Sequence, residues 1–118
     1  MNDLPVLDPR LLQDLLGFGA PLGLVQELLT LFQEDVPVRI AALRMALGSL
    51  DAEQALQEAH QLKGSLANMG LVRFADVAAR IEVYAREGHL EQAPALAELL
   101  PAAYEEALLA LNKAFPGG

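Results

Sequence analysis

The chain has 118 residues, of which 53% are hydrophobic and 20% charged, and its formal net charge is −8. This length supports an ordinary hydrophobic core, so we expect a single domain over residues 1–118. The negative charge argues against nonspecific binding to nucleic acid and against binding to anionic membranes. The absence of cysteine excludes disulfides, thiolate metal sites and thiol catalysis.

The start of the chain, MNDLPVLDPR, lacks the basic residues and the apolar run of a signal peptide. Nor does any stretch approach the roughly 18 uninterrupted apolar residues of a transmembrane helix. We therefore expect a cytoplasmic protein.

A short helix is predicted at about 8–16, because Asp8 provides a capping carboxylate and Pro9 fits the first helical position. A long amphipathic helix is predicted at about 21–47, beginning at Pro21. Its apolar stripe keeps its phase across Pro37, which indicates one kinked helix. The residues of the stripe are Val25, Leu28, Phe32, Val36, Ile40, Leu43, Leu47 and Leu50.

Gly48 and Ser49 interrupt the chain, and Asp51 with Gln54 resembles a capping box that opens a third helix at about 51–69. Gly70 suits the left-handed position just beyond its end. The expected buried seam of this helix consists of Ala52, Ala55, Ala59, Leu62, Leu66 and Met69.

Two further helices are expected at about 71–87, closed by Gly88, and at about 91–115. In the last one Pro94 fits the first turn, whereas Pro101 is expected to bend the helix. The inward residues expected for these two helices are Phe74, Val77, Ile81, Tyr84, Leu96, Leu100, Ala103, Ala107, Leu111 and Ala114.

The expected fold is all-α. Leu and Ala dominate the composition, and no strand-like alternation interrupts the helical periodicity. Short connections make consecutive helices antiparallel neighbours, which predicts an up-down four-helix bundle. The short N-terminal helix would then cover one end of the bundle.

The stretch AHQLKGS, residues 59–65, places a glycine inside the third helix at a cost of about 1 kcal/mol relative to alanine. Gly64 follows His60 by four residues, and both share a stripe with Lys63 and Ala67 beside the buried seam. Helical side chains lean toward the N-terminus, so a side chain at position 64 would cover the imidazole. Gly64 therefore either permits a tight helix crossing or clears an approach to His60, and its place off the seam favours clearance.

An exposed imidazole is mostly neutral near neutral pH, and its free ring nitrogen is a competent nucleophile. Lys63 could attract the oxygens of a phosphoryl group as a point charge. Ser65 could donate a hydrogen bond, although it could equally be an ordinary boundary residue, and Asn68 could simply cap the helix.

The charges near His60 are locally positive. Between Gln61 and Ile81 there are three cations and one anion, a balance of +2, contributed by Lys63, Arg73, Asp76 and Arg80. This balance predicts a basic patch that suits an acidic partner site, although separate solvated cations are the alternative explanation.

The stretch AHQLKGSLANMG resembles the signature of histidine-containing phosphotransfer (HPt) domains, roughly H-x-L-K-G-S-x-x-N-x-G. The flanking stretches ELLTLFQEDVPVRIAALRMAL and AARIEVYAREGHLEQA also resemble the family, so the similarity covers nearly the whole chain. The matching positions of the signature are His60, Leu62, Lys63, Gly64, Ser65, Asn68 and Gly70.

The resemblance implies a four-helix HPt fold in which His60 accepts a phosphoryl group through the ring nitrogen farther from the backbone. Lys63 would balance the phosphate charge, and Gly64 would let the partner approach. Supporting or docking roles would fall to Ser65, Ala67 and Asn68, and with less support from the motif to Gln61, Arg80 and Arg86.

The resemblance also implies the partners. They would be receiver domains of response regulators or of hybrid sensor histidine kinases, and the receiver would supply the Mg²⁺. The chain itself would need no cofactor and would act as a monomer. Because no GxxxxGK[ST] phosphate loop is present, we expect a phosphocarrier and not an ATP-dependent kinase.

A docking module and a metal enzyme are the two alternatives to phosphotransfer. An HPt-like module that only docks a receiver or kinase would not need His60 beside Lys63 and Gly64. A metal enzyme in a four-helix bundle would use Glu-x-x-His pairs. Here Gln57, and not a glutamate, precedes His60 by three residues, and the other histidine, His89, falls in a predicted loop. A metal enzyme of this kind therefore fits the sequence poorly.

Overall fold

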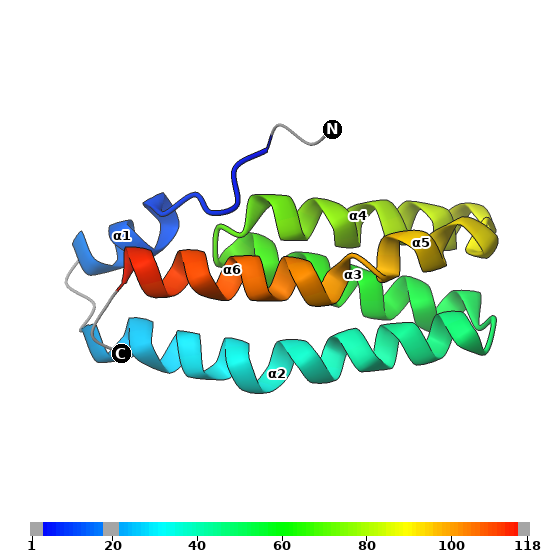
Figure 1. Ribbon diagram of the computed structural model, residues 1–118, viewed down its shortest axis with the longest axis horizontal. Helices are drawn as coiled ribbons and strands as arrows, with labels where there is room; N and C mark the ends of the chain where they lie inside the picture. The colour runs from blue at the N-terminus through cyan, green and yellow to red at the C-terminus, as the bar shows by residue number, and fades with distance from the viewer. Residues whose placement is uncertain (1–3, 18–21, 116–118) are drawn as a thin grey trace.

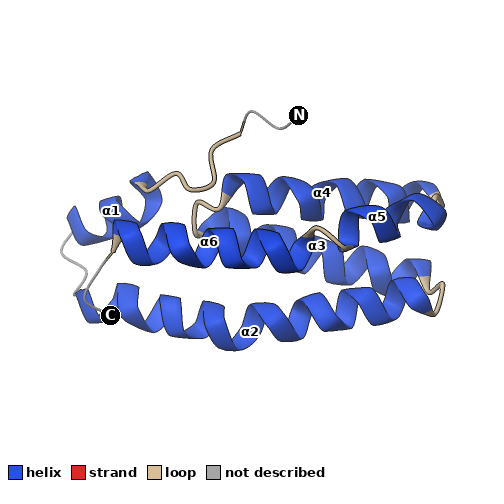
Figure 2. Ribbon diagram, in the orientation of Figure 1, coloured by secondary structure: helices blue, strands red, loops and turns tan. Residues whose placement is uncertain are grey.

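The computed structural model describes residues 4–17 and 22–115 and is elongated, measuring 44 × 27 × 22 Å along its principal axes. Helices joined by short loops make up these residues, and no strand occurs among them (Figure 2). The all-α prediction is therefore confirmed.

Three long helices of the bundle are α2 (Leu22–Gly48), α3 (Ala52–Asn68) and α4 (Val72–Glu87). The short α5 (Ala93–Ala97) and the longer α6 (Leu100–Ala114) together take the place of the fourth. Helix α1 (Arg10–Gly17) lies at the end of the bundle where α2 begins and α6 ends (Figure 1). The pair α3 and α4 makes the most extensive helix contact. The largest fully buried side chains are Leu12, Val25, Leu43, Leu62, Leu66, Leu71, Phe74, Ile81, Leu100 and Leu111.

The N-terminal segment is attached to the turn between α3 and α4. The Asp8 backbone N–H donates to the carbonyl of Gly70 at 2.7 Å, and the Arg73 side chain donates to the carbonyl of Leu4 at 2.9 Å. The side chain of Asp8 also accepts from the backbone N–H of Arg10, at the start of α1, at 3.1 Å. Hydrogen bonds from the Arg10 side chain and then from its backbone lower the pKa of Asp8 to about 2.

Helix α2 runs through Pro37 without interruption, so the prediction of a single helix is confirmed. The expected start at Pro21 lies outside the described residues. Leu50 was wrongly placed in the apolar stripe, because α2 ends at Gly48 and the chain then turns. Leu50 itself takes a left-handed φ of 57° and is 74% exposed.

Asp51 caps α3, but only half of the expected capping box is formed. Its carboxylate accepts from the backbone N–H of Gln54 at 3.1 Å. The Gln54 side chain donates instead to Glu58 at 2.8 Å, and the Asp51 N–H donates to the carbonyl of Ala46 at 3.0 Å. The end of α2 therefore satisfies the donor that the capping box would have used.

The expected helix over 91–115 is broken. A 3-10 turn, η1 (Leu90–Gln92), leads into α5, and a turn at residues 98–99 separates α5 from α6, although both turn residues keep right-handed helical dihedral angles. Pro101 lies in the first turn of α6, where its ring nitrogen cannot donate back to the carbonyl four residues earlier. Ala114, predicted to face inward, is exposed, and Phe115 is buried in its place.

Within residues 4–17 and 22–115, none of the helices combines the length and the apolar character that crossing a membrane requires.

Candidate functional site

Helix α3 places His60 on the surface of the bundle. The preceding residue, Ala59, is fully buried, and so are Leu62, Ala55 and Leu66 on the same helix. His60 therefore lies at the margin of the buried face, about 100° around the helix from Ala59. Its side chain is 66% exposed, so a partner molecule can reach the imidazole directly.

The second residue of the site comes from α4 and was not predicted. The Glu82 side chain is only 3% exposed, and its Oε2 atom lies 3.0 Å from Nδ1 of His60. Lys63 Nζ contacts Oε1 of the same carboxylate at 2.6 Å, and Arg86 Nη2 contacts Oε2 at 2.6 Å. One buried carboxylate thus joins three basic side chains from two helices.

Burial of Glu82 is the largest single influence on this carboxylate and by itself raises its pKa. Hydrogen bonds from Lys63, His60 and Arg86, together with the nearby charge of Lys63, act in the opposite direction and prevail. The pKa of Glu82 is consequently lowered from its ordinary value of 4.5, and Glu82 is ionised near neutral pH. An ionised carboxylate, paired with Lys63 and Arg86, therefore lies beneath His60.

The predicted clearance at Gly64 is present in the structure. A Cβ atom built on Gly64 would meet no described atom within 4 Å, apart from its own helix backbone and neighbours. Gly64 and Ala67, both exposed, continue the stripe of His60 along α3. Since no neighbouring helix approaches Gly64, tight packing does not explain the missing side chain.

The predicted polar residues Ser65 and Asn68 lie on the other side of α3, toward α2. They line a hollow of about 320 Å³ together with apolar side chains of α2 and with Asp35. Gln61 also faces α2, where it accepts a hydrogen bond from Arg39 at 3.0 Å. The structure therefore brings Lys63 to the same carboxylate as His60, but it does not bring Ser65, Asn68 or Gln61 there.

The cations that were expected to form a basic patch near His60 are each paired with a carboxylate. Lys63 pairs with Glu82, which lies one residue beyond the sequence window that gave a positive balance and is shared with Arg86. Arg73 pairs with Glu106 of α6, and Arg80 pairs with Asp76 of α4. Of the two arginines expected to have supporting or docking roles, Arg86 contacts Glu82, whereas Arg80 pairs with Asp76.

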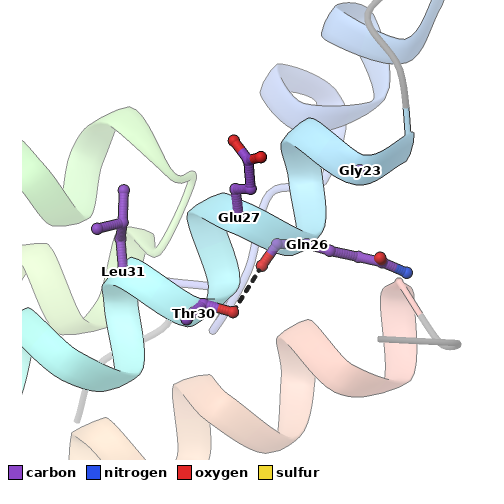
Figure 3. Close-up of a pocket in the computed structure, with 5 residues that line it drawn as sticks. All are labelled: Gly23, Gln26, Glu27, Thr30 and Leu31. Atoms are coloured by element: carbon purple, nitrogen blue, oxygen red, sulfur yellow. Dashed lines mark hydrogen bonds between the residues drawn. The ribbon is translucent and has the colours of Figure 1, made fainter.

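A larger hollow, of about 580 Å³, lies near the start of α2 (Figure 3). Its lining residues all belong to one stretch of α2 and are Gly23, Gln26, Glu27, Thr30 and Leu31. The Thr30 hydroxyl donates to the carbonyl of Gln26, as is common within helices. Because none of the predicted site residues lines this hollow, its size alone does not make it the functional site.

Comparison with known proteins agrees with this geometry. The family model described as the Hpt domain matches residues 27–110. The chain belongs to the Hpt domain family. Among solved structures, the Hpt chain is similar to histidine-containing phosphotransfer protein B from Pseudomonas aeruginosa, with 31% sequence identity, a TM-score of 0.79 and coverage of 96% of each chain. None of the curated proteins compared with the chain matches it.

Membership of the Hpt family assigns the general function. Hpt proteins are histidine phosphotransfer proteins of two-component signalling, and they are phosphocarriers and not enzymes. Within the described residues of this Hpt domain, no group of three or more His, Cys, Asp and Glu side chains is arranged to hold a metal ion.

Glu82 was missed because its role depends on the contact between two helices. A local signal existed, since Glu82 follows the seam residue Ile81 and lies one turn from Ala78 and from Arg86. Ala59, the residue before His60, and Ala78, one turn before Glu82, are both fully buried. A carboxylate at the edge of a helix seam, one turn from an arginine, is the pattern that could have revealed it.

Proposed function

We propose that this Hpt domain accepts a phosphoryl group on His60 from an aspartate of one receiver domain and passes it to another receiver in a multistep phosphorelay. The observation that carries the proposal is the exposed imidazole of His60, 66% accessible, with open space at Gly64 one helical turn away. A reacting aspartyl phosphate can therefore approach His60 without displacing a side chain of α3.

The chemistry requires only positioning and charge stabilisation from this chain. Phosphoryl transfer passes through a loose transition state, so a correctly held nucleophile supplies most of what the carrier can contribute. Nδ1 of His60 is engaged by Glu82, which leaves Nε2 as the nitrogen for attack. Lys63 lies one turn from His60, and its side chain is 35% exposed. Its ammonium group, which pairs with Glu82, would also attract phosphoryl oxygens that arrive at His60.

The proposed partners are receiver domains of a response regulator, of a hybrid sensor histidine kinase, or of both. Mg²⁺ would be bound by the receiver, and no cofactor is assigned to this chain. We expect this phosphoryl transfer to occur in the cytoplasm and the carrier to be a monomer. Lacking a phosphate-binding loop in its sequence, the chain would take its phosphoryl group from a receiver and not from ATP.

The test is to mix the protein with phosphorylated receiver domains and to measure protein-bound phosphate that is labile to acid and stable to base. We expect such phosphate on the wild-type protein and none on His60→Gln. His60 is a surface residue, so this substitution should leave the fold intact, which circular dichroism would check.

His89→Gln is the matched control, because His89 is also an exposed histidine but lies in the loop before η1. It should be phosphorylated as fast as the wild type. If the wild-type protein binds receivers but carries no phosphohistidine, the chain is a docking module and the proposal is wrong.

A further inference from the structure

We infer that the outer face of α2 is a self-association surface, on which a second copy of this Hpt domain packs its own α2 in the antiparallel direction. Three large apolar side chains define this surface, which we name the α2 stripe: Leu31, Val38 and Met45. They are 56%, 65% and 73% exposed. Because they recur every seven residues, they lie in one row along the helix.

No described helix covers the α2 stripe. Helix α2 forms one long edge of the bundle and packs against α3, α5 and α6 (Figure 1). The side that faces these helices is marked by buried residues such as Ile40 and Leu43. Ile40 follows Val38 by two residues, which is about 200° around the helix. The stripe therefore faces away from the core, and the monomer leaves it exposed to solvent.

The charges of α2 favour a second copy as the occupant of the stripe. The half of α2 before Val38 has three acidic residues and no basic one, and they are Glu27, Glu34 and Asp35. The half after Val38 has two basic residues and no acidic one, Arg39 and Arg44. An antiparallel copy of α2 places each acidic half against a basic half, whereas a parallel copy places like charges together.

The stripe is also symmetric about Val38. Leu31 and Met45 each lie seven residues from it, so reversing the helix about Val38 exchanges their positions. In a two-fold pair, Val38 would contact the same residue of the second copy, and Leu31 would contact the second copy's Met45. The same face of α2 is thus complementary to itself in both shape and charge.

The flanking charges differ in how free they are to reach a second copy. Asp35 and Arg39 pair with each other within the chain. In the part of the chain that the structure describes, Glu34 and Arg44 take part in no such ion pair, and both are exposed. Glu34 and Arg44 are therefore the residues whose charges best test the antiparallel direction.

The length of the stripe limits the strength of the pairing. From Leu31 to Met45 the helix rises about 21 Å. Two helices in contact over this length bury less than the roughly 1,200 Å² at which stable interfaces begin. We therefore expect a reversible pair with a dissociation constant on the order of 100 µM, so that the monomer predominates at lower concentrations.

Pairing would restrict access to His60, a consequence that rests on the proposed function. Leu31 belongs to the α2 stripe and also lines the hollow that α2 shares with Ser65 and Asn68 of α3. Ser65 directly follows Gly64, so a second copy on Leu31 would lie beside the approach that Gly64 leaves open. The pair would then be the idle form, and the monomer would be the form that transfers.

The first test is dilution of the protein from about 1 mM to about 20 µM, a range that brackets the expected dissociation constant. Sedimentation equilibrium should show the mass falling from near that of a dimer to that of a monomer. In ¹⁵N NMR spectra, the resonances that move on dilution should be those of residues around Leu31, Val38 and Met45.

Val38→Glu should remain a monomer at about 1 mM, because it brings two carboxylates together at the two-fold axis. Leu109→Glu is the matched control, since Leu109 is also an exposed apolar residue, at 71%, but lies on α6. It should pair as the wild type does. Both substitutions are at the surface, and circular dichroism would check that the fold is retained.

Glu34→Arg and Arg44→Glu test the direction of pairing. Each substitution alone should weaken the pair by about three- to tenfold, because it places like charges against each other across the antiparallel interface. The double variant should recover most of the affinity. In a parallel pair neither single variant would weaken association, since Glu34 would there lie beside the same residue of the second copy.

A wild-type protein that stays a monomer at about 1 mM, with α2 resonances that do not move, would overturn the inference. Wild-type pairing by Val38→Glu would also overturn it, because another surface would then be used. If the α2 resonances move only when a receiver is added, the stripe binds the receiver and not a second copy.

The effect on transfer is measured separately. With a phosphorylated receiver, the transfer rate per carrier should fall as the wild-type concentration rises through the dissociation constant, and it should not fall for Val38→Glu. Equal concentration dependence in the two proteins would show that pairing leaves His60 accessible. If no transfer occurs at any concentration, the proposed function fails, and the dilution experiment still decides whether α2 pairs.

Discussion

Two glycines of the α3 region, Gly64 and Gly70, have opposite physical surroundings. Gly64 has ordinary helical geometry, and a Cβ there would meet no described atom within 4 Å. Gly70 has a left-handed φ of 78°, and a Cβ there would lie 2.2 Å from the carbonyl oxygen of Asp8. The middle of α3 is empty around its glycine, whereas the end of α3 is crowded.

This difference separates function from folding along a single helix. At Gly70 the backbone conformation and the attached N-terminal segment exclude a side chain, so the glycine serves the fold. At Gly64 the fold permits a side chain, and the helix would gain stability from one. The glycine in the middle of α3 is therefore best explained by the approach of a partner to His60.

Gly70→Ala should produce the largest change in stability. The alanine would be strained at positive φ, and its Cβ would collide with the backbone of Asp8, which cannot move aside as a flexible side chain can. We expect a loss of about 2–4 kcal/mol in the free energy of unfolding, measured by urea denaturation. A loss below about 0.5 kcal/mol would mean that the two regions do not differ as described.

Gly64→Gln should have the next largest effect, and this effect should be on the rate of phosphoryl transfer and not on stability. The glutamine side chain would lean toward the N-terminus of α3 and cover His60. We expect transfer from a phosphorylated receiver to slow by about tenfold or more, equivalent to about 1.4 kcal/mol. Thermal denaturation should show the fold unaffected, and unchanged transfer kinetics would argue against the clearance.

Gly64→Ala sharpens the comparison because it adds only one methyl group in open space. The helix should gain about 0.5–1 kcal/mol, since alanine loses less conformational freedom on folding than glycine. Transfer should remain within about twofold of the wild type. Urea denaturation in parallel with Gly70→Ala measures the contrast: one glycine-to-alanine change should stabilise the protein and the other should destabilise it.

The smallest expected effect concerns acid stability. Since the pKa of Glu82 is lowered in the folded protein, its stabilising contribution is present above the ordinary value of 4.5 and is lost as the pH falls through the lowered pKa. The free energy of unfolding should therefore decline in acid less steeply in Glu82→Gln than in the wild type. Identical slopes would indicate that Glu82 is not held ionised by its partners.

Periodicity predicted the helices and the face of α3 correctly, because burial of residues such as Leu62 and Leu66 depends on spacing along one helix. That pattern also placed His60 at the surface and Gly64 off the seam. The break before α6 was not predicted, because the sequence does not reveal whether Pro101 bends a helix or begins a new one.

The electrostatics of the site could not be predicted for a different reason. A count of charges along the chain treated Lys63 as a free cation, although its partner Glu82 follows 19 residues later on another helix. Pairing between helices depends on how α3 and α4 are rotated against each other, which no local pattern specifies. The motif therefore indicated His60 as the proposed nucleophile, and the structure was needed to identify the carboxylate beneath it.

The position of the phosphoryl group on the imidazole can be measured directly, because phosphorus NMR distinguishes the two ring nitrogens of phosphohistidine. After reaction with a phosphorylated receiver, we expect a single resonance of histidine phosphorylated on Nε2. The resonance should be absent in His60→Gln. Phosphate on Nδ1, which Glu82 contacts, or an undiminished signal in His60→Gln would show that phosphotransfer through Nε2 of His60 is wrong.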